Sequence, residues 1–222
     1  MPKCILLDIE GTTTPISWVY ETLFPFARAH LREFLESNLQ EDLQRLEDEY
    51  NADNDPEKPE WNAEQYLTWL LDRDRKSTAL KSIQGKIWEK GFANGELKGE
   101  VFPDVPPALQ RWTDEGKKIY IFSSGSVLAQ KLVFANTKYG DLTQYLSGFF
   151  DTETGPKREP ESYNTIAKKI GIASKDILFL SDVPEELIAA QEARFVITLV
   201  VRPGNKPVHG NPDRSVLSFD GL

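Results

Sequence analysis

The stretch that decides the fold lies near the N-terminus, where residues 5–14 read ILLDIEGTTT. The run Ile5–Leu7 has the continuous apolar character of a strand that is buried on both faces. It delivers two carboxylates, Asp8 and Glu10, into a turn made of Gly and Thr. Side chains two apart on a strand point the same way, so both carboxylates can face one pocket, and Gly11 lets the backbone fold closely around a ligand. The stretch therefore predicts a strand that ends at a reaction centre.

The second half of the chain alternates between helical and strand patterns. Helices are predicted over 107–116, 127–136, 161–170 and 185–193, and strands over 118–122, 177–180 and 196–201. This alternation is typical of a parallel sheet covered by helices. The apolar strand over 3–8 is expected to join that sheet. The predicted fold class is α/β, with a Rossmann-like parallel-sheet core.

Between residues 14 and 99 the pattern is mainly helical. Apolar residues recur there at three-to-four spacing, for example Phe24, Ala27 and Leu31. We expect an all-helical domain over 15–99, inserted into an α/β core formed by 1–14 and 100–222, with a hinge near 95–103. Residues 51–60 are polar and broken by proline, which predicts a loop inside the insert. The acidic run over 41–49 is interpreted as a solvated helix face.

Composition limits the classes of partner. The chain has 222 residues, and its 26 Lys and Arg against 35 Asp and Glu give a net charge of −9. This charge argues against binding to nucleic acid or to an anionic membrane. An anionic substrate must therefore be attracted locally, by a bound cation and a few placed donors. Without a long apolar heptad pattern, we expect a monomer.

Cys4 is the only cysteine, which excludes an intrachain disulfide, and its place on an apolar strand predicts a small core residue. The N-terminus runs directly into strand-like sequence without a basic segment followed by an apolar one. No apolar stretch approaches the length that crosses a bilayer. These patterns predict a cytoplasmic protein.

Chemically active side chains follow the predicted strands. Ligands of open α/β sheets bind beyond the carboxyl ends of the strands, where this chain places several such residues. They are Asp8, Ser123, Ser124, Lys157 and Asp182. Asp and Ser at strand ends are also common helix caps, so each residue alone has a structural interpretation. Their joint occurrence at one rim favours catalysis.

Phosphate chemistry uses each of these residue types. A carboxylate such as Asp8 can attack phosphorus, but the two anions repel, so a hard cation held by oxygen ligands must lie between them. Asp8 and Asp182 can supply that cation site. Ser123 and Ser124, in a strand-to-helix turn, suit the phosphate oxygens. Lys157 can balance the remaining negative charge.

Four features follow one another along the chain: Asp8 with Glu10, the serines at 123 and 124, Lys157, and Asp182. In this order they resemble the four motifs of the haloacid dehalogenase superfamily of phosphatases. Most members carry Asp two places after the nucleophile, whereas this chain has Glu10. The segments 8–17, 122–126, 179–183 and 200–205, which read DIEGTTTPIS, FSSGS, FLSDV and VVRPGN, are similar to the enolase-phosphatase (acireductone synthase) family. The resemblance covers nearly the whole chain and is strongest over 4–28 and 119–205.

The resemblance implies a haloacid dehalogenase-like core with a helical cap, and a two-step reaction. A 2,3-diketo-5-methylthiopentyl-1-phosphate is enolised and then dephosphorylated through an aspartyl-phosphate. The products are the acireductone 1,2-dihydroxy-3-keto-5-methylthiopentene and phosphate, a step of methionine salvage. If the source is eukaryotic, a nuclear pool is expected beside the cytoplasmic one.

The resemblance also implies residue roles. Asp8 is the nucleophile and Glu10 the general acid and base. The substrate is held by Ser123, Ser124 and Lys157. One Mg²⁺ is surrounded by Asp8, Asp182 and Glu10, the last of which contributes its main-chain carbonyl and leaves its side chain free for protons.

Two alternatives remain open. In the first, the chain is another small-molecule phosphatase of the superfamily, in which Glu10 protonates the leaving group and no enolisation occurs. In the second, it is a non-enzymatic module whose acidic pocket holds Mg²⁺ and an acyl phosphate as a regulatory signal. Release of phosphate and ultraviolet absorbance of the conjugated product distinguish the three.

The remaining candidates have structural interpretations. Glu185 and Glu186 suit the start of a helix, although Glu186 is also a candidate neighbour of the metal. His30 and His209 lack the partner spacing of a metal site.

Aromatic residues are interpreted mainly as parts of a core. The five tryptophans are expected to anchor it, with Trp18 or Tyr20 as alternatives for lining the substrate pocket.

Overall fold

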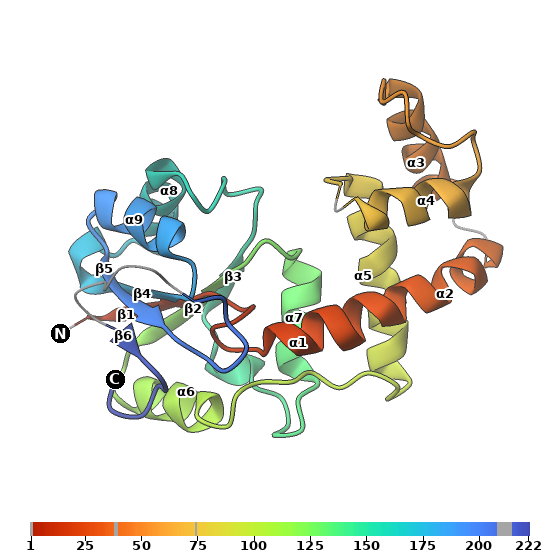
Figure 1. Ribbon diagram of the computed structural model, residues 1–222. Coiled ribbons are helices and arrows are strands. Elements are labelled where there is room, and N and C mark those ends of the chain that lie inside the picture. Colours follow the sequence, from red (N-terminus) through yellow and green to blue (C-terminus); the bar gives the residue numbers. More distant parts are fainter. Residues whose placement is uncertain (1, 38–39, 74, 208–214) are drawn as a thin grey trace. The chain divides into compact units, whose positions relative to one another are not determined.

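The computed structural model describes residues 2–37, 40–73, 75–207 and 215–222 (Figure 1). His209 lies outside these residues. The chain divides into two compact units, one formed by Met1–Val19 with Lys98–Leu222 and the other by Tyr20–Leu97. The first is called the core unit below, and the second the helical unit.

The core unit is built on a parallel sheet. Its strands follow the spatial order β3-β2-β1-β4-β5-β6, and each pairs in parallel with its neighbours. β1 therefore lies inside the sheet, which agrees with its continuous apolar sequence. The predicted α/β class with a parallel sheet is confirmed. The strands are β1 (Cys4–Leu7), β2 (Lys118–Phe122), β3 (Gly148–Phe150), β4 (Ile177–Ser181), β5 (Val196–Val200) and β6 (Ser215–Val216).

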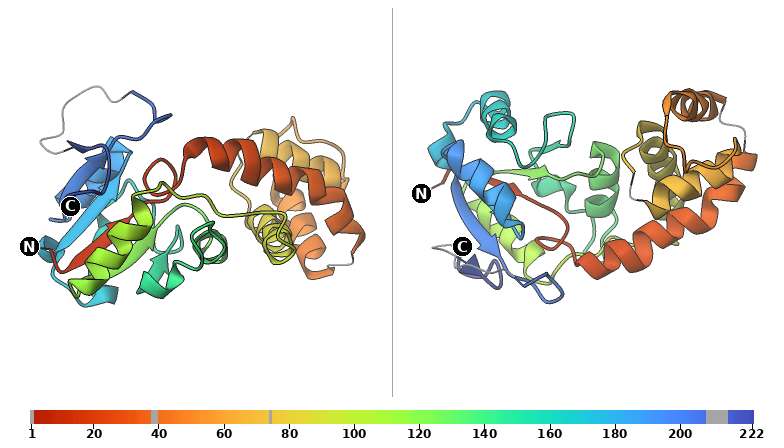
Figure 2. Two further views of the ribbon diagram at one scale, coloured as in Figure 1. Left: turned by 90° about the horizontal axis from the view of Figure 1, so that it is seen from below. Right: turned by 45° about the horizontal axis from the view of Figure 1, so that its top comes forward.

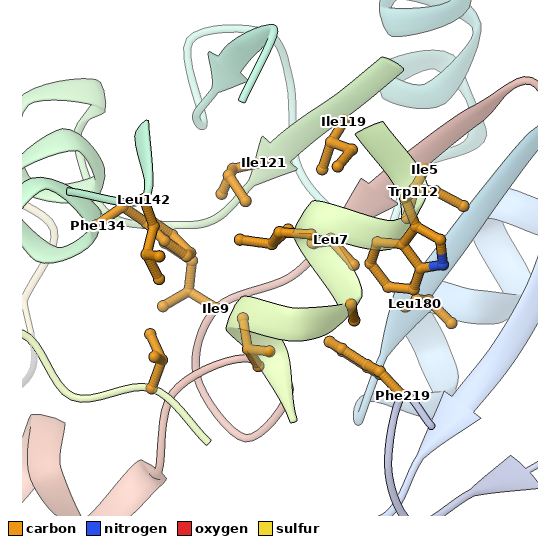
Figure 3. Packing of buried hydrophobic residues seen from close by; sticks show 14 of the residues in the cluster. Ile5, Leu7, Ile9, Trp112, Ile119, Ile121, Phe134, Leu142, Leu180 and Phe219 are labelled. Carbon is orange, nitrogen blue, oxygen red and sulfur yellow. The ribbon is translucent and has the colours of Figure 1, made fainter. Parts of the chain in front are cut away.

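Helices cover both faces of this sheet, as Figure 2 shows for α8 and α9 on one face and α6 on the other. On the α6 face, Trp112 packs over Ile5, Leu7 and Leu180 (Figure 3). The helices and helical turns of the core unit are α1 (Ile16–Trp18), α6 (Val105–Asp114), α7 (Val127–Ala135), η2 (Thr143–Tyr145), α8 (Pro160–Ile170), η3 (Ser174–Asp176) and α9 (Pro184–Glu192). The sheet is thus the middle layer of three.

Alternation along the strands decides which side chains face α8 and α9. On β1, Ile5 and Leu7 join the cluster under α6, whereas Cys4 and Leu6 join the cluster under α8 and α9. Continuing this alternation, Asp8 points to the α8 and α9 side. On β4 the same alternation sends Ser181 to that side. The strand that precedes Asp8 therefore aims its carboxylate at the loops that lead into α8 and α9.

Some predicted boundaries were wrong. α6 begins at Val105 instead of residue 107, because Pro106 and Pro107 fit the first turn of a helix, where no N–H donor is needed. β1 ends at Leu7, one residue before Asp8. α6 ends at Asp114, two residues before its predicted end. β2 matches its predicted range, and the ends of the other predicted helices and strands of the core unit lie within one residue of the prediction. Two strands at the sheet edges, β3 and β6, were not predicted.

The helical unit consists of a π-helical turn and helices that pack on one another. They are η1 (Val19–Leu23), which begins in the core unit, and α2 (Phe24–Glu36), α3 (Gln40–Ala52), α4 (Ala63–Asp72) and α5 (Thr78–Ala93). Asn62 and Ser77 cap α4 and α5 by accepting main-chain N–H groups. The predicted loop over 51–60 begins later, because Asn51 and Ala52 still belong to α3.

Charged residues of α3 do more than solvate its surface. Asp42 is only 3% exposed and pairs with Lys86 of α5, and it also accepts a hydrogen bond from Ser82. Glu49 accepts the Ser77 hydroxyl and the Ala79 N–H. The interpretation of 41–49 as a solvated face was therefore wrong for these two positions.

The aromatic residues and the histidine of the helical unit have packing roles. The ring of His30 stacks on Phe26, and its Nδ1 lies 2.8 Å from the Phe26 carbonyl oxygen. Trp69 and Trp88 are buried, but Trp61 is 40% exposed, so the expectation of a core anchor was wrong there. Among the helices of the described residues, none has the length and apolar character needed to cross a membrane.

Candidate active site

The site is built where three parallel strands end side by side. Leu7 of β1 is in register with Ile121 of β2 and with Leu180 of β4, so the next residues of all three strands reach the same edge. The Asp8 N–H donates to the Leu180 carbonyl at 3.0 Å, which holds the main chain in the sheet up to this point. Asp8 is 2% exposed. The rim predicted from the sequence is therefore a real juxtaposition of strand ends.

The Asp8 carboxylate is held at both oxygens. Its Oδ1 accepts the Ile9 N–H at 2.8 Å and the Lys157 ammonium at 2.5 Å. Its Oδ2 lies 3.2 Å from the Ser181 hydroxyl oxygen. Lys157 is buried, and its main-chain carbonyl accepts the Tyr163 hydroxyl of α8 at 2.7 Å. Asp8 and Lys157, which were expected in one site, thus form a direct buried ion pair.

Glu186 of α9 closes this arrangement into a ring. Its Oε2 lies 2.7 Å from the Lys157 ammonium and 3.1 Å from the Ser181 hydroxyl oxygen. The Val183 N–H donates to that hydroxyl oxygen, which directs the Ser181 proton toward the two carboxylates. Glu186 therefore contacts Lys157 and Ser181 directly, whereas the sequence indicated it only as a candidate neighbour of the metal.

Burial and charge shift the acid–base equilibria of the ring. Burial alone would lower the pKa of Lys157, but the carboxylates of Asp8 and Glu186 outweigh it and hold that pKa above its ordinary value. Burial, with Asp8 as the second cause, raises the pKa of Glu186. Lys157 is thus a fixed positive charge in this pocket.

Glu10 lies on the turn after Asp8 and contacts the end of β2. The Ser123 hydroxyl oxygen lies 3.3 Å from its Oε2, and the Gly125 N–H donates to that hydroxyl oxygen at 3.1 Å. Burial and then the Asp8 charge raise the pKa of Glu10, with Lys157 opposing them. Ser124, next to Ser123, is exposed. The structure therefore brings Asp8, Glu10, Ser123 and Lys157 together, with Ser124 at the solvent side.

The turn that carries Glu10 is tightly closed. The N–H groups of Thr12, Thr13 and Thr14 all donate to the Ile9 carbonyl, and the Thr13 hydroxyl lies 3.1 Å from the Asp8 carbonyl oxygen. These contacts use backbone groups that would otherwise be buried without partners. The turn is thereby a rigid support for Asp8, which precedes it, and for Glu10, which lies in it.

A second segment, residues 202–205, donates side-chain hydrogen bonds to main-chain carbonyls of this turn. The Arg202 Nε donates to the Thr12 carbonyl at 3.1 Å, and the Asn205 Nδ2 donates to the Gly11 carbonyl at 2.9 Å. Arg202 is itself fixed by an ion pair with Asp104. The segment that contributed VVRPGN to the family resemblance is thus a structural brace of the turn that follows Asp8.

Asp182 follows β4 and faces Gly11. A Cβ placed on Gly11 would lie 2.3 Å from Asp182 Oδ2, so only glycine allows this approach. Burial, and then the charge of Asp8, raise the pKa of Asp182 to about 7. Among the described residues, Asp182 Oδ1 is buried without a hydrogen-bond partner. A buried carboxylate oxygen in this situation is poorly accommodated unless a cation or a donor approaches it.

The charges of the pocket fit a divalent cation. Four carboxylates, those of Asp8, Glu10, Asp182 and Glu186, face a single ammonium, that of Lys157. The described residues contain no group of three or more His, Cys, Asp or Glu side chains placed to hold a metal. A set of two carboxylates and one main-chain carbonyl does not need such a group, since Mg²⁺ keeps several waters. The residues present therefore fit the ion that the resemblance implies.

Three residues of the site were not assigned a role from the sequence. Ser181 could have been noticed as the one polar residue at the end of an otherwise apolar strand, ILFLS. Arg202 and Asn205 lie in the segment VVRPGN, which contributed to the family resemblance, but no role of either residue was inferred from it. Trp18 is buried and Tyr20 is 65% exposed, and their expected contact with substrate stays a prediction.

The fold and the site are accompanied by a match to a known class of protein, the haloacid dehalogenase-like hydrolases. The sequence profile of this class matches residues 2–194. "Enolase-phosphatase E1" of Synechococcus elongatus is 50% identical over 98% of this chain and 96% of its own length. The protein of the same name from Persephonella marina is 46% identical over 100% of this chain and 99% of its own length.

A solved structure is similar to this chain in both fold and sequence. The crystal structure of the UTR4 protein (Unknown transcript 4 protein) of Saccharomyces cerevisiae has a TM-score of 0.84 and 34% identity, and the match covers 100% of both chains. The chain therefore belongs to the enolase-phosphatase E1 family within the haloacid dehalogenase-like hydrolases.

Proposed function

We propose that the chain is a bifunctional enzyme that enolises 2,3-diketo-5-methylthiopentyl-1-phosphate and then removes its phosphate, as a step of methionine salvage. The observation that carries this proposal is the placement of two different carboxylates at one strand end. The Asp8 carboxylate accepts a hydrogen bond from Lys157, whereas the Glu10 carboxylate accepts one from Ser123. One carboxylate can thus form a covalent bond while the other moves protons.

Enolisation requires a base beside the carbon that bears the phosphate. The Glu10 carboxylate removes a proton from C1, the C1–C2 double bond forms, and the C2 carbonyl oxygen becomes an enolate oxygen, so the proton stays on Glu10 for the next step. A glutamate extends one methylene further than an aspartate, which lets its oxygens reach a carbon atom beyond the phosphate. The Ser123 hydroxyl orients this carboxylate from the side of β2.

Phosphate removal uses Asp8 as nucleophile. An Asp8 oxygen bonds to phosphorus while the bond from phosphorus to the C1 oxygen breaks, and Glu10 protonates that leaving oxygen. Water then attacks phosphorus, gives its proton to Glu10 and frees Asp8 together with inorganic phosphate. Lys157 supports both steps as a buried cation that attracts the phosphate, while Ser123 and Ser124 bind its oxygens.

We assign the ion site to Asp8, Asp182 and the main-chain carbonyl of Glu10, holding one Mg²⁺. When bound, the ion neutralises the negative charge that the phosphate brings into a pocket already rich in carboxylates. The unpartnered Asp182 Oδ1 and the excess of carboxylates support this assignment.

The other parts of the proposal concern the whole chain. We propose that the helices of 15–99 act as a cap that excludes water while the enolised intermediate forms and selects the substrate by its inner surface. We further propose a monomer that works in the cytoplasm. The absence of a long apolar heptad pattern supports the monomer, and the absence of an apolar stretch long enough to cross a bilayer supports the cytoplasmic location.

The experiment that tests the function follows ultraviolet absorbance and inorganic phosphate together. Purified protein is incubated with the diketone phosphate and Mg²⁺, and Asp8→Asn is compared with Asp141→Asn, a loop variant outside the site. We expect both signals in the wild type and in Asp141→Asn, and neither in Asp8→Asn or after chelation. Phosphate without the absorbance of the conjugated enol would support a plain phosphatase, and stoichiometric labelling without turnover would support a regulatory switch.

A further inference from the structure

Asn205 holds its side-chain amide in one orientation. Its Nδ2 donates to the Gly11 carbonyl at 2.9 Å. The reversed amide would place its Oδ1 against that carbonyl oxygen, two acceptors without a proton between them, so the orientation follows from the contact. Asn205 Oδ1 must therefore point away from Gly11 O.

With this orientation, Asn205 Oδ1 lies on the same side of Gly11 as the carboxylate of Asp182. Asn205 Oδ1 and Asp182 Oδ2 lie 3.0 Å and 2.3 Å from the same point, where a Cβ on Gly11 would stand. Within the part of the chain that the structure describes, both Asn205 Oδ1 and Asp182 Oδ1 are buried without a hydrogen-bond partner. A buried amide oxygen and a buried carboxylate oxygen without donors are both costly, and a hydrated cation at the Asp182 carboxylate is the simplest group that satisfies both.

We propose that Asn205 belongs to the Mg²⁺ site and accepts a hydrogen bond from a water that the ion retains. This inference rests on the ion site of the proposed function and adds to it a residue from the 202–205 brace. Mg²⁺ gives up its waters reluctantly, so neighbours of its hydration shell contribute to affinity. The brace thereby connects ion binding to the turn that carries Asp8 and Glu10.

The test measures Mg²⁺ affinity by titration calorimetry in the absence of substrate, so that it does not depend on turnover. Asn205→Ala removes both the donor and the acceptor, and we expect about tenfold weaker Mg²⁺ binding. Asn205→Asp replaces the donor to Gly11 O with an acceptor, which repels that carbonyl oxygen, but it keeps an oxygen facing the ion and adds a negative charge whose attraction to Mg²⁺ offsets this repulsion. We expect it to bind Mg²⁺ at least as tightly as the wild type.

Asn136 provides the matched control. Its Nδ2 also donates to a main-chain carbonyl, that of Leu132, at 2.8 Å, and it stands at the end of α7. Asn136→Ala and Asn136→Asp are expected to leave Mg²⁺ affinity unchanged. Urea unfolding of all four variants with a chelator measures how much each lost hydrogen bond matters for the fold itself.

Each outcome separates the inference from the proposed function. Wild-type affinity in Asn205→Ala, or equally weakened binding in both Asn205 variants, would overturn the inference and leave Asn205 as a brace of Gly11 only. Asp182→Asn is expected to abolish binding in either case. A wild-type chain that does not bind Mg²⁺ would overturn the ion site of the proposed function together with this inference.

Discussion

Replacing Gly11 with alanine tests how closely the nucleophile turn approaches Asp182. Gly11 has a φ of +73°, and an added Cβ would lie 2.3 Å from Asp182 Oδ2, whereas ordinary contacts of this kind begin at 3.4 Å. The Asp182 carboxylate must therefore move by about 1 Å. A displacement of about 1 Å in an active site can lower the rate by about 100-fold.

Gly171→Ala is the matched control for this substitution. Gly171 has almost the same backbone angle, a φ of +74°, but nothing lies within 4 Å of its added Cβ. The left-handed conformation alone costs about 1–2 kcal/mol in a residue with a side chain. Without metal, Gly171→Ala should lose this amount of unfolding free energy, and Gly11→Ala should lose at least as much, because it carries the same strain and also displaces Asp182.

The assay is urea unfolding with and without Mg²⁺. At a concentration of 100 times its dissociation constant, Mg²⁺ should add about 2.7 kcal/mol to the unfolding free energy of the wild type and of Gly171→Ala. Gly11→Ala should gain less than half of this, since its Asp182 is displaced. Full stabilisation of Gly11→Ala by Mg²⁺ would refute the reasoning that places Asp182 at the ion.

Three more outcomes follow from the site and the core. Glu10→Gln should lower the rate of enolisation by about 100-fold or more while substrate binding changes little, as measured by absorbance and by KM; an equal loss of both contradicts the role of Glu10. Lys157→Met leaves the buried carboxylates of Asp8 and Glu186 unpaired and should cost about 3–5 kcal/mol in urea unfolding, whereas a loss below about 1 kcal/mol would show that the ion pairs do not stabilise the fold. Burial raises the pKa of the Cys4 thiol to about 12 from 9.0, so alkylation of the native protein at pH 8 should be about 1,000-fold slower than that of a free thiol, and labelling at the free-thiol rate would show that the strand is open to solvent.

The central strands could be predicted because burial on both faces leaves a continuous apolar run. β1 and β4 were recognised on this basis, and their parallel pairing followed from the helices between them. β3 has three residues and β6 has two, too few to show a period, so their places at the sheet edges depend on tertiary pairing. Asp42 was misjudged for a similar reason, since its partner Lys86 lies 44 residues further along the chain.

From the sequence, only the part of the site that directly follows the ends of predicted strands could be predicted. Asp8, Ser123 and Lys157 were expected together because carboxyl ends of parallel strands share one edge. The contacts of Ser181 with Asp8 and of Asn205 with Gly11 join residues 173 and 194 positions apart, and no local pattern encodes them. Their side chains serve by bracing the turn and the carboxylates, which becomes visible only in three dimensions.

The most direct test of the central claim is to find the residue that receives the phosphate. Enzyme quenched with acid during turnover is treated with borohydride, which reduces an aspartyl phosphate to homoserine, and the modified position is located by mass spectrometry. We expect homoserine at position 8 in the wild type and none in Asp8→Asn. Modification at another residue, or turnover without any modified residue, would contradict it.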